Sequence, residues 1–248
     1  MIQPNDFHKE ILNIVDSFLH KNDYDGAEKQ LLNFLTDAVE NKDFSTEILL
    51  RNELMGLYRK LGKGQKAVEM VESVITLIEE KELESNIGSA TTFLNSATVY
   101  KAFGSPEKSI ILFEKAKKIY EEKLSVDDER LGGLYNNMAL TLVDLKRFSE
   151  AKEFNLKAIE IMKNKPLEIA ITYLNMATAS ETELGLLEAN EEITELLKKA
   201  KTLLENYQNR DGYYAFVCEK CASVFGYYGD FLYDEELQSR ARRIYEGA

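Results

Sequence analysis

The sequence predicts an all-α solenoid, a stack of six antiparallel helix pairs in which each pair packs against its neighbours. The first observation is a pair of small or apolar residues that returns about every forty-two residues. The pairs are Val15 with Phe34, Met55 with Val74, Ala97 with Ala116, Ala139 with Ala158, Ala177 with Ala200, and Ala222 with Ala241. The second observation is a helical spacing of apolar residues throughout. Such self-similarity is typical of solenoids, whose units bury their apolar faces against one another.

Twelve helices account for nearly every residue. We expect them at 5–20, 24–40, 45–61, 64–82, 87–103, 106–123, 128–145, 148–163, 167–184, 189–206, 211–228 and 231–246. In the first helix, Ile11, Val15 and Phe18 share one face. In the sixth, Ile110 and Phe113 follow the same spacing. Every helix therefore has one apolar face to bury against a neighbour.

The breaks between helices carry residues that begin or end helices. Gly62 and Gly104 stand where the first helix of a pair should end, and glycine is favoured there. Ser105 precedes Pro106, and Asn164 and Lys165 precede Pro166 between the fourth and fifth pairs, so a proline begins each of two helices. The alanine pairs are explained by close packing, because two helices joined by a short turn approach closely only with small side chains at the crossing.

Composition excludes several classes of function. Forty-three acidic residues against thirty-one basic ones leave a net charge of −12, which disfavours nucleic acid because phosphates need a basic surface. The amphipathic first twenty residues are interrupted by charges and resemble neither a signal peptide nor a membrane span. With two cysteines and no export signal, we expect a cytoplasmic protein without disulfides and without membrane or nucleic-acid partners.

Two segments carry a resemblance to a known family. LNSATVYKAFGSPEKSIILFEKAKKIYEE (94–122) and LYNNMALTLVDLKRFSEAKEFNLKAIEI (134–161) resemble the tetratricopeptide repeat, in the longer variety found in kinesin light chains. The resemblance covers essentially the whole chain and implies a right-handed superhelix whose first helices line a concave groove. It implies a single domain over 1–248, with repeats at 5–43, 44–85, 86–126, 127–165, 166–208 and 209–248.

A row of amides marks the face that this resemblance turns into the groove. Two residues before the crossing position of each first helix stand Asn13, Glu53, Asn95, Asn137, Asn175 and Lys220. Asn52 and Asn136 lie one residue earlier on nearly the same face. Asparagine needs a reason to sit within a helix, and its amide can pair with both the N–H and the C=O of a peptide unit.

Two interpretations of the row remain open. Peptide-binding members of the family use asparagines to hold an extended backbone, and the resemblance implies the same here. An inward asparagine can equally bond to the neighbouring helix and stabilise the stack. The candidate peptide-binding residues are Asn13, Asn52, Asn95, Asn136, Asn137, Asn175, Lys101, Thr98 and Thr178. The remaining groove positions, Leu94, Leu140, Val143 and Leu174, are apolar. Basic residues at the spacing of a carboxylate clamp are lacking on this face.

No catalytic or metal-binding motif is found. Cys218 and Cys221 form a C-x-x-C pair, but two ligands do not make a zinc site, and by repeat register both occupy packing positions. His8 and His20 have no partner at a catalytic spacing. We expect no enzymatic activity, no cofactor and no metal.

The C-terminal stretch 213–233 is rich in aromatic residues. Its members are Tyr213, Tyr214, Phe216, Phe225, Tyr227, Tyr228, Phe231 and Tyr233. Part of this cluster must cover the core of the last repeat, and the remainder can form either a self-association patch or the end wall of the binding groove.

Three functions are compatible with the sequence. The leading hypothesis is an interaction module that binds a peptide or an extended protein segment in its groove. The alternatives are a scaffold or homo-oligomerisation module acting through the aromatic C-terminal end, and a peptide-sensing regulator without its own effector domain.

Overall fold

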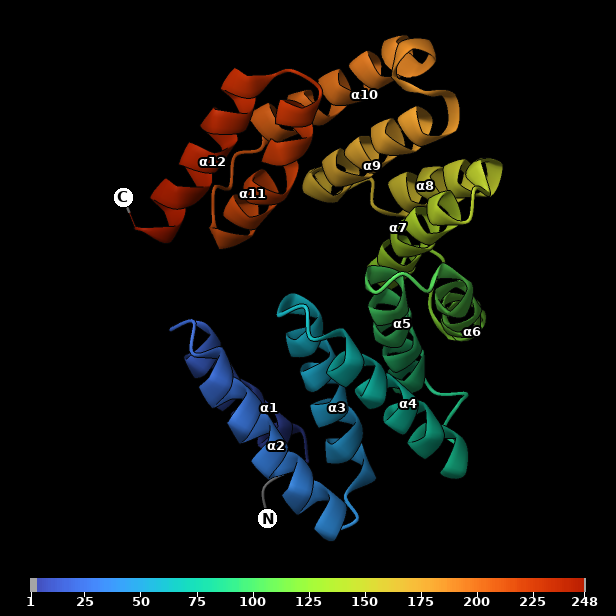
Figure 1. Ribbon diagram of the computed structural model, residues 1–248, viewed down its shortest axis with the longest axis vertical. Coiled ribbons are helices and arrows are strands. Elements are labelled where there is room, and N and C mark those ends of the chain that lie inside the picture. The colour runs from blue at the N-terminus through green and yellow to red at the C-terminus, as the bar shows by residue number, and fades with distance from the viewer. Residues whose placement is uncertain (1–3, 248) are drawn as a thin grey trace. The chain divides into compact units, whose positions relative to one another are not determined.

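The computed structural model of the protein describes the backbone of residues 4–247 and the side chains of residues 7–247, and within that range it is all-helical (Figure 1). The helices are α1 (Pro4–Leu19), α2 (Tyr24–Glu40), α3 (Phe44–Lys60), α4 (Gly64–Glu80), α5 (Ile87–Ala102), α6 (Pro106–Lys123), α7 (Glu129–Asp144), α8 (Phe148–Ile161), α9 (Pro166–Leu184), α10 (Leu186–Asn206), α11 (Gly212–Tyr227) and α12 (Phe231–Tyr245). The predicted α-solenoid of six helix pairs is confirmed. Residues 1–3 and 248, which the predicted domain includes, lie outside the described residues.

The largest difference from the predicted bounds is at the start of α10. The helix begins at Leu186 rather than at residue 189, because Gly185 alone joins it to α9 in a left-handed conformation with φ 84°. These two helices have 19 and 21 residues, longer than any of the others. The added length explains the spacing of twenty-three between Ala177 and Ala200, since about four extra residues are close to one helical turn and keep the same face inward.

The predicted helix ends carry the expected turn conformations. Gly62 and Gly104 have φ values of 68° and 75°, so both occupy the left-handed region that glycine favours. Aspartate or asparagine begins several helices: Asp43 accepts a hydrogen bond from the backbone N–H of Thr46, and Asn86 accepts one from Ser89. These two caps fix the starts of α3 and α5.

The chain divides into two compact units, Met1–Lys123 (unit 1) and Leu124–Ala248 (unit 2). Each consists of three antiparallel helix pairs, and each second helix packs against its own first helix. Within unit 1, the first helices α3 and α5 also pack together, and within unit 2 α9 packs against both α7 and α11. Asparagines on these first helices therefore lie on neighbouring helices, α3 with α5 in unit 1 and α7 with α9 in unit 2. The single domain over 1–248 stays a prediction.

The crossing positions form the core, as predicted. Eleven of the twelve paired residues named above are buried, and only Phe34 is half-buried. Large side chains close around them, among them Phe93, Phe113 and Tyr120 in unit 1 and Tyr214 and Phe225 in unit 2. Small residues at the helix contact with bulky ones around it are the packing that the repeat requires.

Candidate functional site

The asparagine row does not face solvent uniformly. Asn13 is exposed on α1, whereas Asn52, Asn95, Asn137 and Asn175 are half-buried on α3, α5, α7 and α9. Asn136 is buried, so its side chain lies within unit 2 and not on an open surface. The groove position of Leu174 needs the same correction, because this side chain belongs to the core of unit 2.

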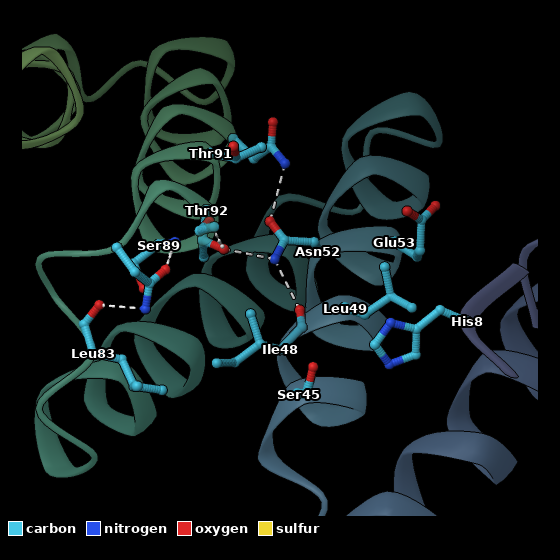
Figure 2. A pocket seen from close by; sticks show the side chains of 13 residues that line it. His8, Ser45, Ile48, Leu49, Asn52, Glu53, Leu83, Ser89, Thr91 and Thr92 are labelled. Carbon is cyan, nitrogen blue, oxygen red and sulfur yellow. Dashed lines mark hydrogen bonds between the residues drawn. The ribbon is translucent and has the colours of Figure 1, made fainter. Parts of the chain in front are cut away.

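In unit 1, two asparagines of successive repeats bond to each other. The amide nitrogen of Asn52 donates to the carbonyl of Ile48, at 2.8 Å, and to the Thr92 hydroxyl, at 2.9 Å. Its amide oxygen accepts from the amide nitrogen of Asn95 at 3.0 Å. Figure 2 shows Asn52 between Thr92 and Glu53, with dashed bonds to Thr92 on α5 and to the backbone of Ile48 in its own helix. The pair thus links α3 to α5 through side chains alone.

A cavity of about 570 Å³ opens beside this pair. It is lined by residues of α1, α3, α5 and the turn before α5: His8, Ser45, Ile48, Leu49, Asn52, Glu53, Leu83, Asn86, Gly88, Ser89, Thr91, Thr92 and Asn95. Its volume falls within the range that holds small ligands, and its lining combines leucine and isoleucine with amides and hydroxyls. The amide oxygen of Asn95 accepts no hydrogen bond from any described residue, so it is available to a ligand.

One edge of the cavity is held by a chain of hydrogen bonds. The Thr46 hydroxyl donates to the carboxylate of Asp43 at 2.6 Å, so its oxygen must accept from Nε2 of His8, at 3.0 Å. These bonds hold the pKa of Asp43 below its usual value, the Thr46 hydroxyl being the largest cause. These hydrogen bonds connect α1 to the start of α3 and so position the His8 ring at the cavity.

Glu53 is the one half-buried carboxylate of the cavity lining. No described residue donates a hydrogen bond to it or pairs with it. Burial raises its pKa, and the nearby carboxylate of Asp16 adds to the effect. The cavity therefore holds an acidic group that the fold leaves unneutralised.

In unit 2 the fold engages two of the corresponding amides, those of Asn136 and Asn137. Asn136 accepts from the Thr172 hydroxyl at 2.9 Å, and the amide nitrogen of Asn137 donates to the carbonyl of Gly133 in its own helix. No described residue bonds to the side chain of Asn175. Asn136 supports the structural interpretation of the row, whereas Asn175 resembles Asn95 in having a free amide oxygen.

The remaining candidates lie apart from the cavity. The hydroxyls of Thr98 and Thr178 donate to carbonyls of their own helices, and Lys101 is half-buried in the last turn of α5. Asn13 borders a shallow hollow on α1 with Lys9 and Ile14. Thr98 bonds to the backbone carbonyl of Asn95, at 2.7 Å, but none of these four residues lines the cavity.

Sequence reasoning missed three parts of the site: Glu53, His8 and Thr92. The signal for Glu53 was its place as the acidic member of the asparagine row. The signal for Thr92 was a threonine at the equivalent position of another repeat, because Thr92 and Thr172 each stand five residues before a crossing alanine, Ala97 or Ala177. His8 carried no such signal, because its contact with Thr46 spans two repeats.

The predicted burial of the cysteines is confirmed. Cys218 and Cys221 are both free and fully buried in the core of unit 2. Burial raises the pKa of both thiols, that of Cys221 to about 12. Within residues 7–247, no three His, Cys, Asp or Glu side chains gather as metal ligands would. No helix in the described part of the chain combines the length and apolar character needed to cross a bilayer.

The aromatic C-terminal stretch divides as expected. Tyr214, Phe225 and Tyr233 are buried in the core of unit 2. Four others remain exposed: Tyr213, Phe216, Tyr227 and Phe231. The hydroxyls of Tyr227 and Tyr228 donate to the carboxylate of Glu181 on α9, so part of this surface is oriented by the fold.

Comparison with known proteins points to one repeat type. Residues 88–164 match the family model described as Tetratricopeptide repeat. A kinesin light chain-related protein of Arabidopsis thaliana is 26% identical over 203 residues, which cover 77% of this chain and 30% of that protein. The chain thus spans less than a third of the length of this relative.

Solved structures share the fold. BtubC (BKLC) from P. vanneervenii superposes with a TM-score of 0.69 at 20% identity, over 81% of this chain and 82% of that one. A Rap protein complexed with Competence and Sporulation Factor gives a TM-score of 0.64 at 13% identity, over 100% of this chain and 66% of that one. At these identities the likeness concerns the fold.

Proposed function

The chain is a tetratricopeptide-repeat protein with kinesin-light-chain-like repeats, and on that premise we propose that it binds an extended peptide segment across the exposed faces of α3 and α5. Tetratricopeptide repeats form protein–protein interaction modules, and the family is typically non-enzymatic. The partner we propose is therefore a protein or peptide, bound without catalysis or cofactor.

The observation that carries the proposal is the Asn52–Asn95 pair at the wall of the 570 Å³ cavity. The pair fixes the orientation of Asn95, which keeps a free oxygen and a second N–H. An amide so placed can accept from a peptide N–H and donate to a peptide C=O, which holds a backbone without reading its sequence. The Rap protein of the same fold, complexed with Competence and Sporulation Factor, adds support that such a fold holds a second molecule.

A selection with a defined probe tests the proposal. A phage-displayed library of random dodecapeptides is selected on the wild-type protein, and enriched peptides are synthesised with a fluorophore for anisotropy titration. We expect Asn95→Ala to weaken binding about 2- to 13-fold, since a lost neutral hydrogen bond is worth about 0.5–1.5 kcal/mol. Asn137→Ala is the matched control, because its amide nitrogen bonds to its own helix in unit 2.

Two results would contradict the proposal. A selection that enriches no peptide would do so directly. Unchanged affinity in Asn95→Ala, with the melting temperature preserved, would show that enriched peptides bind elsewhere.

The exposed aromatic residues favour a second candidate function, self-association through the C-terminal end. Tyr227 and Phe231 are 69% and 68% exposed, and Leu232 beside them is 81% exposed. Apolar side chains gathered in this way favour contact with another surface. We expect Phe231→Asp to shift sedimentation of a dimeric wild type toward the monomer; a wild type that stays monomeric at high concentration retires this candidate.

A further inference from the structure

Glu53 stands apart from the other shielded carboxylates of unit 1. Glu28 is paired with Lys63 and Lys66, and Glu47 is paired with Arg51. Glu53 is half-buried as well, yet no described residue pairs with it. Removing a carboxylate from water without a partner is unfavourable, so a fold that keeps one at a cavity wall is complementary to a cation.

The cavity around Glu53 suits a cationic side chain in size and in chemistry. Its 570 Å³ is open to an elongated group, and the leucine and isoleucine side chains of the lining can pack against methylene groups. The free amide oxygen of Asn95 provides a second acceptor. Besides Glu53, the only titratable group of the lining is His8, and the carboxylate of Asp16 lies near enough to act on Glu53.

Asparagine and glutamate at the same position of the row can have different roles in binding. Glu53 occupies the position that Asn95, Asn137 and Asn175 occupy in other first helices. An amide at this position can hold any peptide backbone, whereas a carboxylate selects for charge. The net charge of −12 adds a field that attracts basic segments.

We propose that the cavity between α1, α3 and α5 receives a lysine or arginine side chain of the bound peptide, with Glu53 as its ion-pair partner and the amide oxygen of Asn95 as a second acceptor. This proposal rests on the proposed peptide-binding function and gives it a sequence preference. The raised pKa of Glu53 supports it, because a bound cation would offset the burial that disfavours the carboxylate.

The test uses the peptides enriched from the dodecapeptide library. The best binder is resynthesised with norleucine for each lysine and with citrulline for each arginine, which remove the charge and keep the length. We expect one such replacement to weaken binding to the wild type about tenfold or more, as a charge-assisted hydrogen bond is worth about 1.5–3 kcal/mol. In Glu53→Gln, the charged and neutral peptides should bind within about twofold of each other.

Glu80→Gln is the matched control, because Glu80 is an exposed carboxylate on α4 outside the cavity lining. This variant should keep the preference of the wild type for the charged peptide. The melting temperature of Glu53→Gln should be no lower than that of the wild type, since no described partner is lost.

The outcomes of this test distinguish the basic-residue proposal from the proposal of peptide binding on which it rests. The basic-residue proposal is overturned if replacing lysine with norleucine, or arginine with citrulline, leaves the affinity for the wild type unchanged. The proposal of peptide binding would then still stand. A charge preference that survives in Glu53→Gln also overturns the basic-residue proposal. A selection without any enriched peptide overturns both.

Discussion

The two units contain the same asparagine–threonine pair, bonded in opposite directions and in different surroundings: Asn52 donates to the Thr92 hydroxyl, whereas Asn136 accepts from the Thr172 hydroxyl. Asn52 bonds to Thr92 in unit 1, and Asn136 bonds to Thr172 in unit 2, at matching register positions and at 2.9 Å in each case. Asn52 borders an open cavity, whereas Asn136 is buried. The same pair of residue types therefore supports a binding surface in one unit and helix packing in the other.

The residues around each bond account for the difference. Beside Thr92, α5 carries the small residues Gly88, Ser89 and Thr91, all of which line the cavity. At the corresponding positions α9 carries Glu168, Ile169 and Ile171, and both isoleucines are buried. A local motif thus acquires its role from the volume of its neighbours, since a cavity exists only where surrounding side chains leave it unfilled.

The largest expected effect concerns the crossing position, which is Met55 in unit 1 and Ala139 in unit 2. Met55 is fully buried, so Met55→Ala should lower the free energy of unfolding by about 2–5 kcal/mol through lost contacts and a cavity. Ala139→Leu should overpack unit 2 at a cost of about 1–3 kcal/mol. Urea unfolding checks both; an unchanged midpoint in either variant would show that the two positions are not equivalent.

The second prediction compares the ionic contacts that stabilise each unit. Unit 1 buries the Glu28 carboxylate between Lys63 and Lys66, whereas unit 2 buries the Arg240 guanidinium among Glu205, Glu236 and Tyr214. Hydrogen bonds from the two lysines lower the pKa of Glu28 to about 2. The stabilisation that this carboxylate contributes is complete above its ordinary pKa of 4.5 and is lost as the pH falls toward 2.

Thermal unfolding of Glu28→Gln as a function of pH checks this. The deficit of the variant against the wild type should shrink between about pH 4.5 and pH 2. Glu53→Gln is the control of opposite sign, because the raised pKa of Glu53 makes its ionised form destabilising near neutral pH. A deficit of Glu28→Gln that is independent of pH would contradict the ionic interpretation.

The third prediction tests the asparagine–threonine bonds directly. Asn136→Ala should destabilise unit 2 by about 1–3 kcal/mol, because the lost volume and acceptor are buried. Asn52→Ala should cost about 0.5–1.5 kcal/mol although Asn52 makes more hydrogen bonds, since water in the cavity can replace them. Chemical denaturation of both variants decides; a larger loss for Asn52→Ala would reverse the comparison.

The smallest expected effect concerns Gly56, an exposed residue of α3 whose counterpart in unit 2 is Leu140. An added Cβ would meet nothing within 4 Å, so Gly56→Ala should stabilise the helix by about 0.5–1 kcal/mol. Differential scanning calorimetry provides the measurement. A decrease in melting temperature would show that this face of α3 is more crowded than its exposure indicates.

The helices and their core were predictable because their signals are local and repeated. Apolar residues at helical spacing, glycines at helix ends and alanines at the crossings each act within a few residues or one repeat. The same local rule placed Cys218 and Cys221 in the core, and the structure confirms it. The prediction from local signals was less accurate at the start of α10, where a single glycine joins two helices that we expected to be separated by a loop of several residues.

The sequence by itself determined the repeat, the helices, the buried crossings and the row of amides. Only the tertiary structure decided which amides are available to a ligand. Asn95 keeps a free amide oxygen at a cavity, whereas the amide oxygen of Asn136 accepts a hydrogen bond from Thr172. The tertiary structure also singled out Glu53 as unpaired. The physical reason is that a side chain's partner and its exposure depend on residues some forty positions away, whose bulk and rotamers no local pattern specifies.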